Sequence, residues 1–221
     1  MTYVELIVVL SIFATMCAIS LVSYNGFQAR IEIRRLANDI ALQVVQAQKD
    51  ASAGKLANSY FCQDCKPSYG VYFTKNDPYD VNHNHFIYFA DLNGNGVYDP
   101  GSGCGNLGDE CVEEFDITRN NYISDIVPIG DSCPSSIDDA YLVSTRSESG
   151  IHLRSSDPNL DNSCSSVQGI RIIASSTEGI RSSVEVYLSG RIQIVSVSTT
   201  PPVNPSCNGP LCSSNLGTDM N

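Results

Sequence analysis

The chain has 221 residues, of which 42% are hydrophobic and 17% are charged, and its 24 acidic residues outnumber 13 Lys and Arg to give a formal net charge of -11. This length supports one medium-sized domain with an appendage, and the apolar fraction excludes a chain that is disordered throughout. Because nucleic-acid binders need cations to displace phosphate counterions, the acidic balance disfavours DNA or RNA as the main ligand.

Residues 1–29 predict a helix that is apolar on every side. No charged residue lies between Glu5 and Arg30, and about 20 apolar residues are enough to span a bilayer. The pattern then continues without a break into an amphipathic helix over residues 30–54, with Gly54 as its stop. We therefore expect one helix of about 50 residues, roughly 75 Å long, with a projecting apolar half. The expected buried stripe of the second half is Ile33, Leu36, Ile40, Val44, Ala47 and Ala51.

Glu5 is the informative residue of the apolar half. A carboxylate in the middle of a bilayer costs about 2.5–3.5 kcal/mol, so such a group usually has a partner and a role. The alternative interpretation is that Glu5 lies at the membrane interface and has no functional role.

The run TYVELIVVL over residues 2–10, followed by further apolar residues and an amphipathic helix, resembles the mature N-terminus of a type IV pilin or pseudopilin. In that family a prepilin peptidase removes a short basic leader and the new terminal amine is methylated. The resemblance places Met1 at that processed position and implies that the Glu5 carboxylate pairs with the amine of Met1, its own or a neighbour's, during filament assembly. Val22 stands where many pilins carry a proline, and Gly26 is the alternative point at which the helix loosens.

Residues 55–198 predict a disulfide-rich β domain, and residues 199–221 form a tail rich in Pro and Ser. A long helix followed by an antiparallel sheet is an α+β arrangement. With the resemblance it implies the pilin fold, a long N-terminal helix packed on a C-terminal antiparallel β-sheet domain. The segment Leu36–Ala51 and a closing hairpin at Leu188–Arg191 resemble most the H-type pseudopilins of type II secretion. The expected strands are Tyr69–Thr74, Phe86–Ala90, Cys111–Ile117, Tyr122–Ile129, Ala140–Thr145, Ile151–Arg154, Gly169–Ala174, Ser183–Ser189 and Arg191–Val197.

Eight of the nine cysteines follow the long helix, six in residues 55–198 and two in the tail, and they predict disulfides formed in an oxidising compartment. Cys17 lies in the apolar run and is expected to act as a small apolar side chain. Cys62 and Cys65 are alternatively half of a zinc site, although no second CxxC follows. Eight cysteines permit 105 connectivities, and pairing sequence neighbours is the simplest. That assignment gives Cys62–Cys65, Cys104–Cys111, Cys133–Cys164 and Cys207–Cys212.

Residues 91–99, DLNGNGVYD, fit the first nine positions of an EF-hand-like Ca²⁺ loop. Ser102 stands at the twelfth position instead of the usual bidentate Glu, and Asp109, Glu110 or Glu113 is the candidate for the missing ligand. The alternative is a Gly/Asn turn without an ion. The proposed ligands are Asp91, Asn93, Asn95, the carbonyl of Val97, and Asp99.

Two weaker metal-site candidates have ordinary alternatives. Asp157–Asp161 echoes the loop but also fits a common turn. His83 and His85 would share a face if extended, but they also fit a solvated loop before a strand. Four nearby tyrosines are interpreted as packing residues rather than a ligand platform, namely Tyr69, Tyr72, Tyr79 and Tyr88.

The leading interpretation is a structural subunit that polymerises into an extracellular type IV pilus-like filament after residing as a single-pass protein in the inner membrane. Its expected partners are other copies of the chain, the pilus assembly machinery and the prepilin peptidase. The first alternative is a minor pilin or an H-type pseudopilin of a type II secretion system, and the second is a membrane-tethered Ca²⁺-binding or adhesive module that does not polymerise. The sequence lacks Gly-x-Ser-x-Gly, a P-loop and a metallohydrolase His pair, so we do not expect an enzyme.

Overall fold

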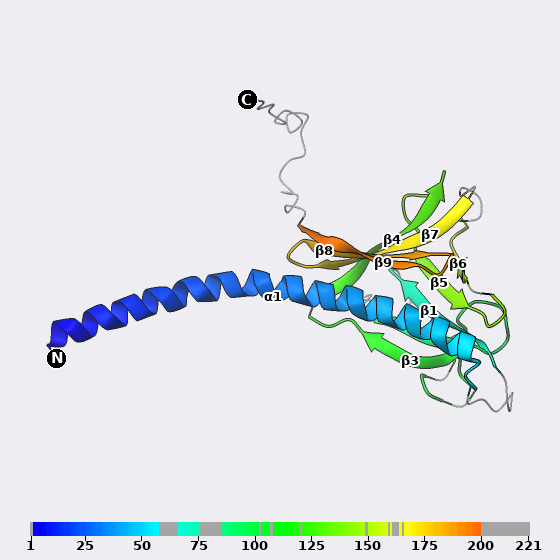
Figure 1. Ribbon diagram of the computed structural model, residues 1–221, viewed down its shortest axis with the longest axis horizontal. Coiled ribbons are helices and arrows are strands. Elements are labelled where there is room, and N and C mark those ends of the chain that lie inside the picture. The colour runs from blue at the N-terminus through cyan, green and yellow to red at the C-terminus, as the bar shows by residue number, and fades with distance from the viewer. Residues whose placement is uncertain are drawn as a thin grey trace, which may run out of the picture.

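The computed structural model describes residues 2–57, 66–75, 85–101, 103–106, 108–119, 121–148, 150–158, 160, 164 and 166–199, without the side chains at 19–26 and 196–199. The helix α1 (Tyr3–Ala53) leads the chain. Its first half projects away from the rest of the molecule, and its second half lies along the strands (Figure 1). The side chains of α1 are described over two stretches, residues 3–18 and 27–53.

The second half of α1 is amphipathic and packs on the domain through one stripe. All six residues that the sequence predicts for this stripe are buried, and Ala37 between them is fully buried as well. The helix ends at Gly54, whose φ of 63° is the left-handed conformation that glycine adopts without a steric cost. The backbone N–H of Gly54 donates to the Ala51 carbonyl, and that of Lys55 donates to the Asp50 carbonyl. These bonds fix where the helix stops and the chain turns towards the strands.

The strands form two antiparallel sheets in the part of the chain that is described. The first sheet consists of β1 (Ser68–Thr74), β2 (His85–Asp91), β3 (Cys111–Asp116), β5 (Asp139–Ser144) and β6 (Ile151–Arg154), in the spatial order β3-β2-β1-β5-β6. The second sheet consists of β4 (Asn121–Asp131), β7 (Ser166–Ser176), β8 (Ile180–Tyr187) and β9 (Ile192–Thr199), in the order β4-β7-β8-β9.

The predicted fold class is wrong. The sequence led us to expect a long helix packed on one antiparallel sheet domain, whereas nine of the ten described elements are strands and they form two separate antiparallel sheets. Alternating apolar residues show which segments are strands, but they do not show which strands pair. The division falls between β3 and β4, where the chain leaves the first sheet. An isolated bridge between Ile126 and Ile137 joins β4 to the segment that returns to the first sheet at β5.

Alternate residues of the first sheet enter two different apolar clusters. On β2, Phe86, Tyr88 and Ala90 face the main core, which also contains the buried stripe of α1 and residues of the second sheet. Ile87 and Phe89 face the opposite side, where they join a smaller cluster. Because β2 and β5 are buried nearly throughout, this sheet is covered on both faces. The smaller cluster consists of Ile87, Phe89, Cys111, Tyr141 and Val143, with Tyr72, Val97 and Tyr98 packed against it.

Two disulfides tie the loops of the domain. Cys104 pairs with Cys111 and Cys133 with Cys164, as the assignment of sequence neighbours predicts. Cys17 is a free, exposed thiol on the projecting half of α1. The remaining four cysteines, Cys62, Cys65, Cys207 and Cys212, lie outside the described residues.

The end of α1 is held on the first sheet by Asp50. This side chain is 9% exposed and accepts hydrogen bonds from Tyr88 Oη at 2.7 Å, Lys55 Nζ at 2.5 Å and Gln46 Nε2 at 2.7 Å. Burial alone raises the pKa of Asp50, but the hydrogen bonds from Lys55, Tyr88 and Gln46 outweigh it and the pKa lies below its ordinary value. The ionised carboxylate therefore stabilises the packing of α1 against β2.

The two described disulfides are expected to contribute unequally to stability. Cys133–Cys164 closes a loop of 31 residues and Cys104–Cys111 one of 7, and a longer loop restricts the unfolded chain more. Replacing both cysteines of a pair by Ser should lower the free energy of unfolding by about 4 kcal/mol for the first pair and about 2 kcal/mol for the second. Urea denaturation of the full chain in detergent measures this difference, and an equal or inverted order would contradict it.

Replacing Asp50 by Asn should destabilise the fold in a pH-dependent way. Because the pKa of Asp50 is lower in the folded than in the unfolded chain, its stabilising effect is complete above the ordinary value of 3.8 and is lost as the pH falls through the folded pKa. We expect Asp50→Asn to cost about 2 kcal/mol at neutral pH and much less well below pH 3.8. Thermal melts at both pH values test this, with Asp39→Asn, an exposed acid on the same helix, as the control that changes little at either pH.

Candidate functional site

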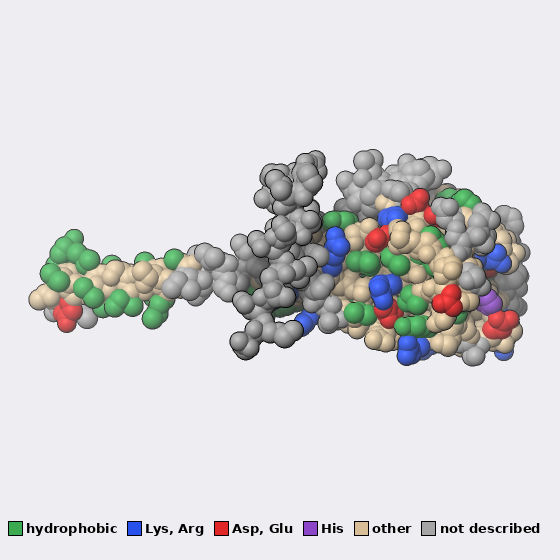
Figure 2. Space-filling model, turned by 90° about the horizontal axis from the view of Figure 1, so that it is seen from above, with side chains coloured by type: hydrophobic (Ala, Val, Ile, Leu, Met, Phe, Trp, Pro, Cys, Tyr) green, Lys and Arg blue, Asp and Glu red, His purple; other side chains and the backbone are tan. Residues whose placement is uncertain are grey.

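The projecting half of α1 presents a largely apolar surface over residues 3–18. Every described side chain from Thr2 to Ala18 is exposed. Figure 2 shows this half as a narrow rod with hydrophobic side chains along it and the domain at the far end. An exposed apolar surface of this extent marks an interaction site. The large apolar residues, exposed between 48% and 78%, are Tyr3, Val4, Leu6, Ile7, Val8, Val9, Leu10, Ile12, Phe13 and Met16.

Polar side chains on this rod are satisfied within the helix. Ser11 Oγ donates to the Val8 carbonyl and Thr15 Oγ1 to the Ile12 carbonyl, both at 2.8 Å. The rod therefore buries few unsatisfied hydroxyls when another apolar surface covers it. Among the residues searched, which are the described ones, no helix is both long and apolar enough to cross a membrane.

Glu5 caps the beginning of α1. Its Oε2 atom accepts a hydrogen bond from the backbone N–H of Thr2 at 3.2 Å, which is the Glu-to-N-cap half of a capping box. The Leu6 N–H donates to the Thr2 carbonyl at 3.3 Å. The carboxylate is thus held at the positive end of the helix dipole. The Met1 amine, which the resemblance pairs with Glu5, lies outside the described residues.

The candidate Ca²⁺ loop follows β2 and is organised by Asp91. This residue is 4% exposed. Its Oδ1 atom accepts from the backbone N–H of Gly94 at 2.7 Å and of Asn95 at 3.1 Å, and its Oδ2 atom accepts from Gly96 at 3.0 Å. Gly94 and Gly96 have φ values of 75° and 74°, which explains why glycine stands at both positions. The loop is therefore wrapped around the Asp91 carboxylate.

The remaining predicted ligands also hydrogen-bond one another. The side-chain amides of Asn93 and Asn95 donate to Asp99 Oδ2 at 2.6 and 2.8 Å. The side-chain Oδ1 atom of Asn95 accepts from the backbone N–H of Val97 at 2.7 Å. In this arrangement the loop is a closed turn, and binding a cation requires Asp99 to release the two amides. Among the described residues, no group of three or more His, Cys, Asp or Glu side chains has the geometry of a metal site.

Glu110 is the acid closest to completing this loop. It is 5% exposed, and its two carboxylate oxygens accept from the backbone N–H groups of Leu92 at 3.1 Å and Asp99 at 2.9 Å. Burial raises the pKa of Glu110, and the charges of Asp99 and Asp91 raise it further. A cation in the loop would relieve this repulsion. Ca²⁺ binding therefore remains a prediction, with Glu110 as the ligand that the sequence pattern left open.

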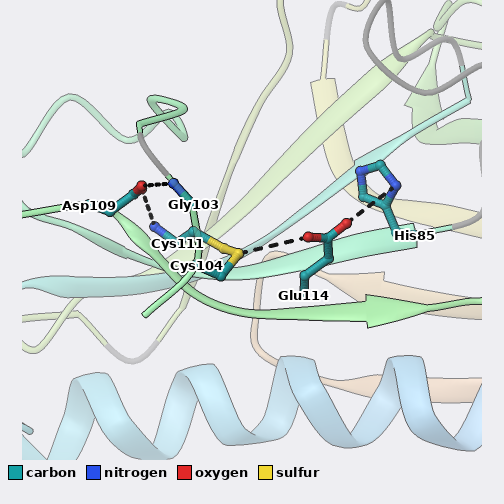
Figure 3. Close-up of a disulfide and its surroundings, with 6 residues drawn as sticks. All are labelled: His85, Gly103, Cys104, Asp109, Cys111 and Glu114. Carbon is teal, nitrogen blue, oxygen red and sulfur yellow. Dashed lines mark hydrogen bonds and ion pairs between the residues drawn. A yellow bond between two sulfur atoms is a disulfide. The ribbon is translucent and has the colours of Figure 1, made fainter. Parts of the chain in front are cut away.

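Asp109 and Glu113, the other two candidates for the missing ligand, serve different roles. Asp109 accepts from the backbone N–H groups of Gly103 at 2.8 Å and Cys111 at 3.0 Å, and so braces the Cys104–Cys111 disulfide (Figure 3). Glu113 is exposed on β3. Ser102 lies outside the described residues.

His85 lies next to Glu114, which in turn lies next to the same disulfide. Its Nδ1 atom lies 3.8 Å from Glu114 Oε1, and the other oxygen of Glu114 lies 4.0 Å from Cys104 Sγ (Figure 3). His83, the second histidine of the proposed pair, lies outside the described residues, as do Asn159 and Asp161 of the shorter acidic echo. Tyr69 stacks on Tyr88 with ring centroids 5.8 Å apart, which fits the packing interpretation of the tyrosines. Tyr79 is not among the described residues.

A groove beside α1 was not predicted from the sequence. It has a volume of about 610 Å³ and lies between the second half of α1 and residues 116–119 and 121, around the connection from β3 to β4. The helix side is lined by Phe27, Ile31 and Arg35. Arg119 on the far side forms an ion pair with Glu32. The sequence does contain a pattern that could have indicated an apolar surface here. On the face opposite the buried stripe, apolar residues recur at helical spacing and are exposed, namely Phe27, Ile31, Leu42 and Val45.

Comparison with models of protein families, with curated protein sequences and with solved structures gives no match. Function is therefore inferred from the residues and their geometry.

Ca²⁺ binding to the loop predicts a rise in the melting temperature. A ligand present at 100 times its dissociation constant stabilises the folded state by about 2.7 kcal/mol, which corresponds to a rise of roughly 5–10 °C for a chain of this size. Asp99→Asn should abolish the rise, because it removes one carboxylate charge at an exposed position. The matched control is Glu178→Gln, an exposed acid in the turn between β7 and β8, which should keep it. No rise for the unmodified chain at millimolar Ca²⁺ would exclude the site.

Proposed function

We propose that this protein is a structural subunit that polymerises through the projecting half of α1 into an extracellular filament of the type IV pilus kind. The observation that supports this most directly is the run of ten large exposed apolar side chains on a helix that extends beyond its own domain. A surface of this kind needs a cover, and a second copy of the chain carries the same surface.

The rod has the features of a helix that packs against other helices. Ser11, Ala14 and Ala18 are small residues that let neighbouring backbones approach closely. Successive copies added with a translation along the rod make contacts that do not close into a ring, and such contacts produce open helical filaments. The domain, braced by two disulfides, would then form the outer surface of the filament.

The N-terminal resemblance gives this proposal its cellular setting. It implies a subunit whose leader is removed by a prepilin peptidase, whose Met1 amine is methylated, and which resides as a single-pass protein in the inner membrane before assembly. In this setting the charge of Glu5 is unfavourable in an apolar environment and is neutralised when the subunit docks. A docking step that neutralises one charge also selects the axial position of the incoming helix.

A second candidate function is a membrane-tethered module that binds Ca²⁺ and does not polymerise. The loop around Asp91, with Glu110 behind it, is the observation that favours it. The two candidates differ in one outcome, since a tethered module remains monomeric at the surface. A minor pilin or a pseudopilin keeps the polymerising helix and differs from a major subunit in copy number, which protein quantification of sheared filaments measures.

Replacing Glu5 by Gln tests the polymerisation. Gln at this position of the helix still supports the capping box, so the variant removes the charge while preserving the helix start. Because loss of one member of a buried charge pair is worth roughly 2 kcal/mol or more, filament yield should fall at least about tenfold. Electron microscopy of sheared surface material, with immunoblotting of total protein, measures this yield.

Glu178→Gln is the control for the same assay, because it removes one acid from the domain surface and should leave filament yield unchanged. Unchanged filaments in Glu5→Gln would contradict the role of the charge. A native protein found only as monomers would contradict the proposed function itself.

A further inference from the structure

We infer that Arg30 and Arg34, where the rod of α1 meets the domain, form a binding site for the headgroups of anionic phospholipids while the subunit resides in the membrane. We call these two residues the arginine pair. The inference rests on the membrane-resident stage that both candidate functions share, and it adds the class of lipid that the subunit selects.

The first argument is the patch of α1 in which the arginine pair lies. Arg30 and Arg34 are exposed, and the apolar side chains of Phe27 and Ile31 beside them are exposed by 63% and 48%. Residues three or four apart on a helix are neighbours, so these four side chains form one continuous patch on α1. Helices that lie at a membrane surface carry this combination, because apolar side chains enter the boundary of the acyl chains while cations contact the headgroups.

The charges of the arginine pair are available in the subunit. Neither Arg30 nor Arg34 makes a hydrogen bond or an ion pair with another residue that the structure describes. The chain as a whole carries a net charge of -11, which an anionic bilayer repels. Two unpaired cations at the point where the helix leaves the bilayer oppose this repulsion locally.

The acids near this part of α1 lie on another side of the helix. Five charged residues line the groove, namely Glu32, Arg35, Asp39, Asp116 and Arg119. Glu32 is paired with Arg119, and Asp39 lies 3.9 Å from Arg35. By helical spacing, the residues of α1 that line the groove and the arginine pair occupy opposite flanks of the helix. The arginine pair therefore keeps its positive charge.

The length of the apolar segment matches this placement. Arg30 follows Glu5 by 25 residues without a charge between them, which is about 38 Å of helix. The hydrocarbon core of a bilayer is about 30 Å thick, and the bilayer with its headgroups is about 40–45 Å. A helix with Glu5 at one edge of the core therefore brings Arg30 to the opposite headgroup layer. Arg34 is about 6 Å further, but helical side chains lean towards the N-terminus and so back towards the bilayer.

The chemistry of the arginine pair selects an anionic lipid. A guanidinium donates two parallel N–H bonds to phosphate oxygens. A phosphatidylcholine headgroup carries a cation next to its phosphate, which repels the arginines, whereas phosphatidylglycerol has no such cation. Each arginine near an anionic surface is worth about a fivefold preference.

Native mass spectrometry of the full chain tests this selection. In detergent micelles that contain equal amounts of phosphatidylglycerol and phosphatidylcholine, phosphatidylglycerol adducts should exceed phosphatidylcholine adducts at least about fivefold. Arg30→Gln combined with Arg34→Gln should bring the two adducts close to equality. Arg30→Lys combined with Arg34→Lys should retain most of the preference, because it keeps both charges.

The matched control combines Lys66→Gln with Arg146→Gln. This variant removes the same two charges from exposed positions beside Gly54. Gly54 follows Arg30 by 24 residues, about 36 Å along the helix, whereas charges are screened over about 8 Å at physiological salt. The control should therefore keep the preference of the unmodified chain.

The outcomes separate the inference from the proposed function. Equal adducts for the unmodified chain, a preference that survives the Gln pair at 30 and 34, or an equal loss in the control would each overturn the lipid site. A chain that prefers phosphatidylglycerol but forms no filaments would overturn polymerisation and leave the lipid site intact. A chain that forms filaments without a lipid preference would do the reverse.

Discussion

The structure depends on an apolar rod that its own domain does not cover. Ten large apolar side chains of α1 are exposed by about half or more, and burying such a side chain completely is worth about 1.5–3 kcal/mol. Covering the rod therefore contributes on the order of 10 kcal/mol or more, which is comparable with the total stability of a domain. A free energy of this size is large enough to drive association. The domain does not cover the rod, because this half of α1 projects away from the strands (Figure 1).

The rest of the fold holds this rod in a defined direction. The buried stripe of α1 joins a core that includes both sheets, so the helix is fixed by two surfaces rather than by one. The left-handed Gly54 and the Asp50 carboxylate then fix the point at which the helix ends on the first sheet. Rigid attachment matters for assembly because a rod that pivoted on its domain would lose orientational freedom on docking, and that loss opposes association.

The sequence predicted local structure well and the assembly of the strands poorly. Apolar spacing located the buried stripe of α1, and β-branched and aromatic runs located the strands, because both patterns report on residues close in sequence. The division into two sheets depends on which strands pair across the chain, and only long-range contacts decide that. The same limit applies to the candidate sites. Asp91 and its glycines could be recognised as a loop motif in the sequence. Glu110, in contrast, lies 11 residues after Asp99, and the groove requires residues 116–119 and 121 to lie against α1.

Glu5 links the stability of the free subunit to the way it associates. In the isolated chain its carboxylate accepts the Thr2 N–H and lies at the positive end of the helix dipole, so the charge is tolerated without a second copy. An apolar surface that covers the rod removes water from this group, and the dipole alone is then a weak substitute for solvation. In the proposed filament, a cation on a neighbouring copy would be the partner of Glu5 at that stage. The same carboxylate is therefore compatible with a solvated monomer and selective in a buried interface, because its need for a partner appears only when apolar surfaces come together.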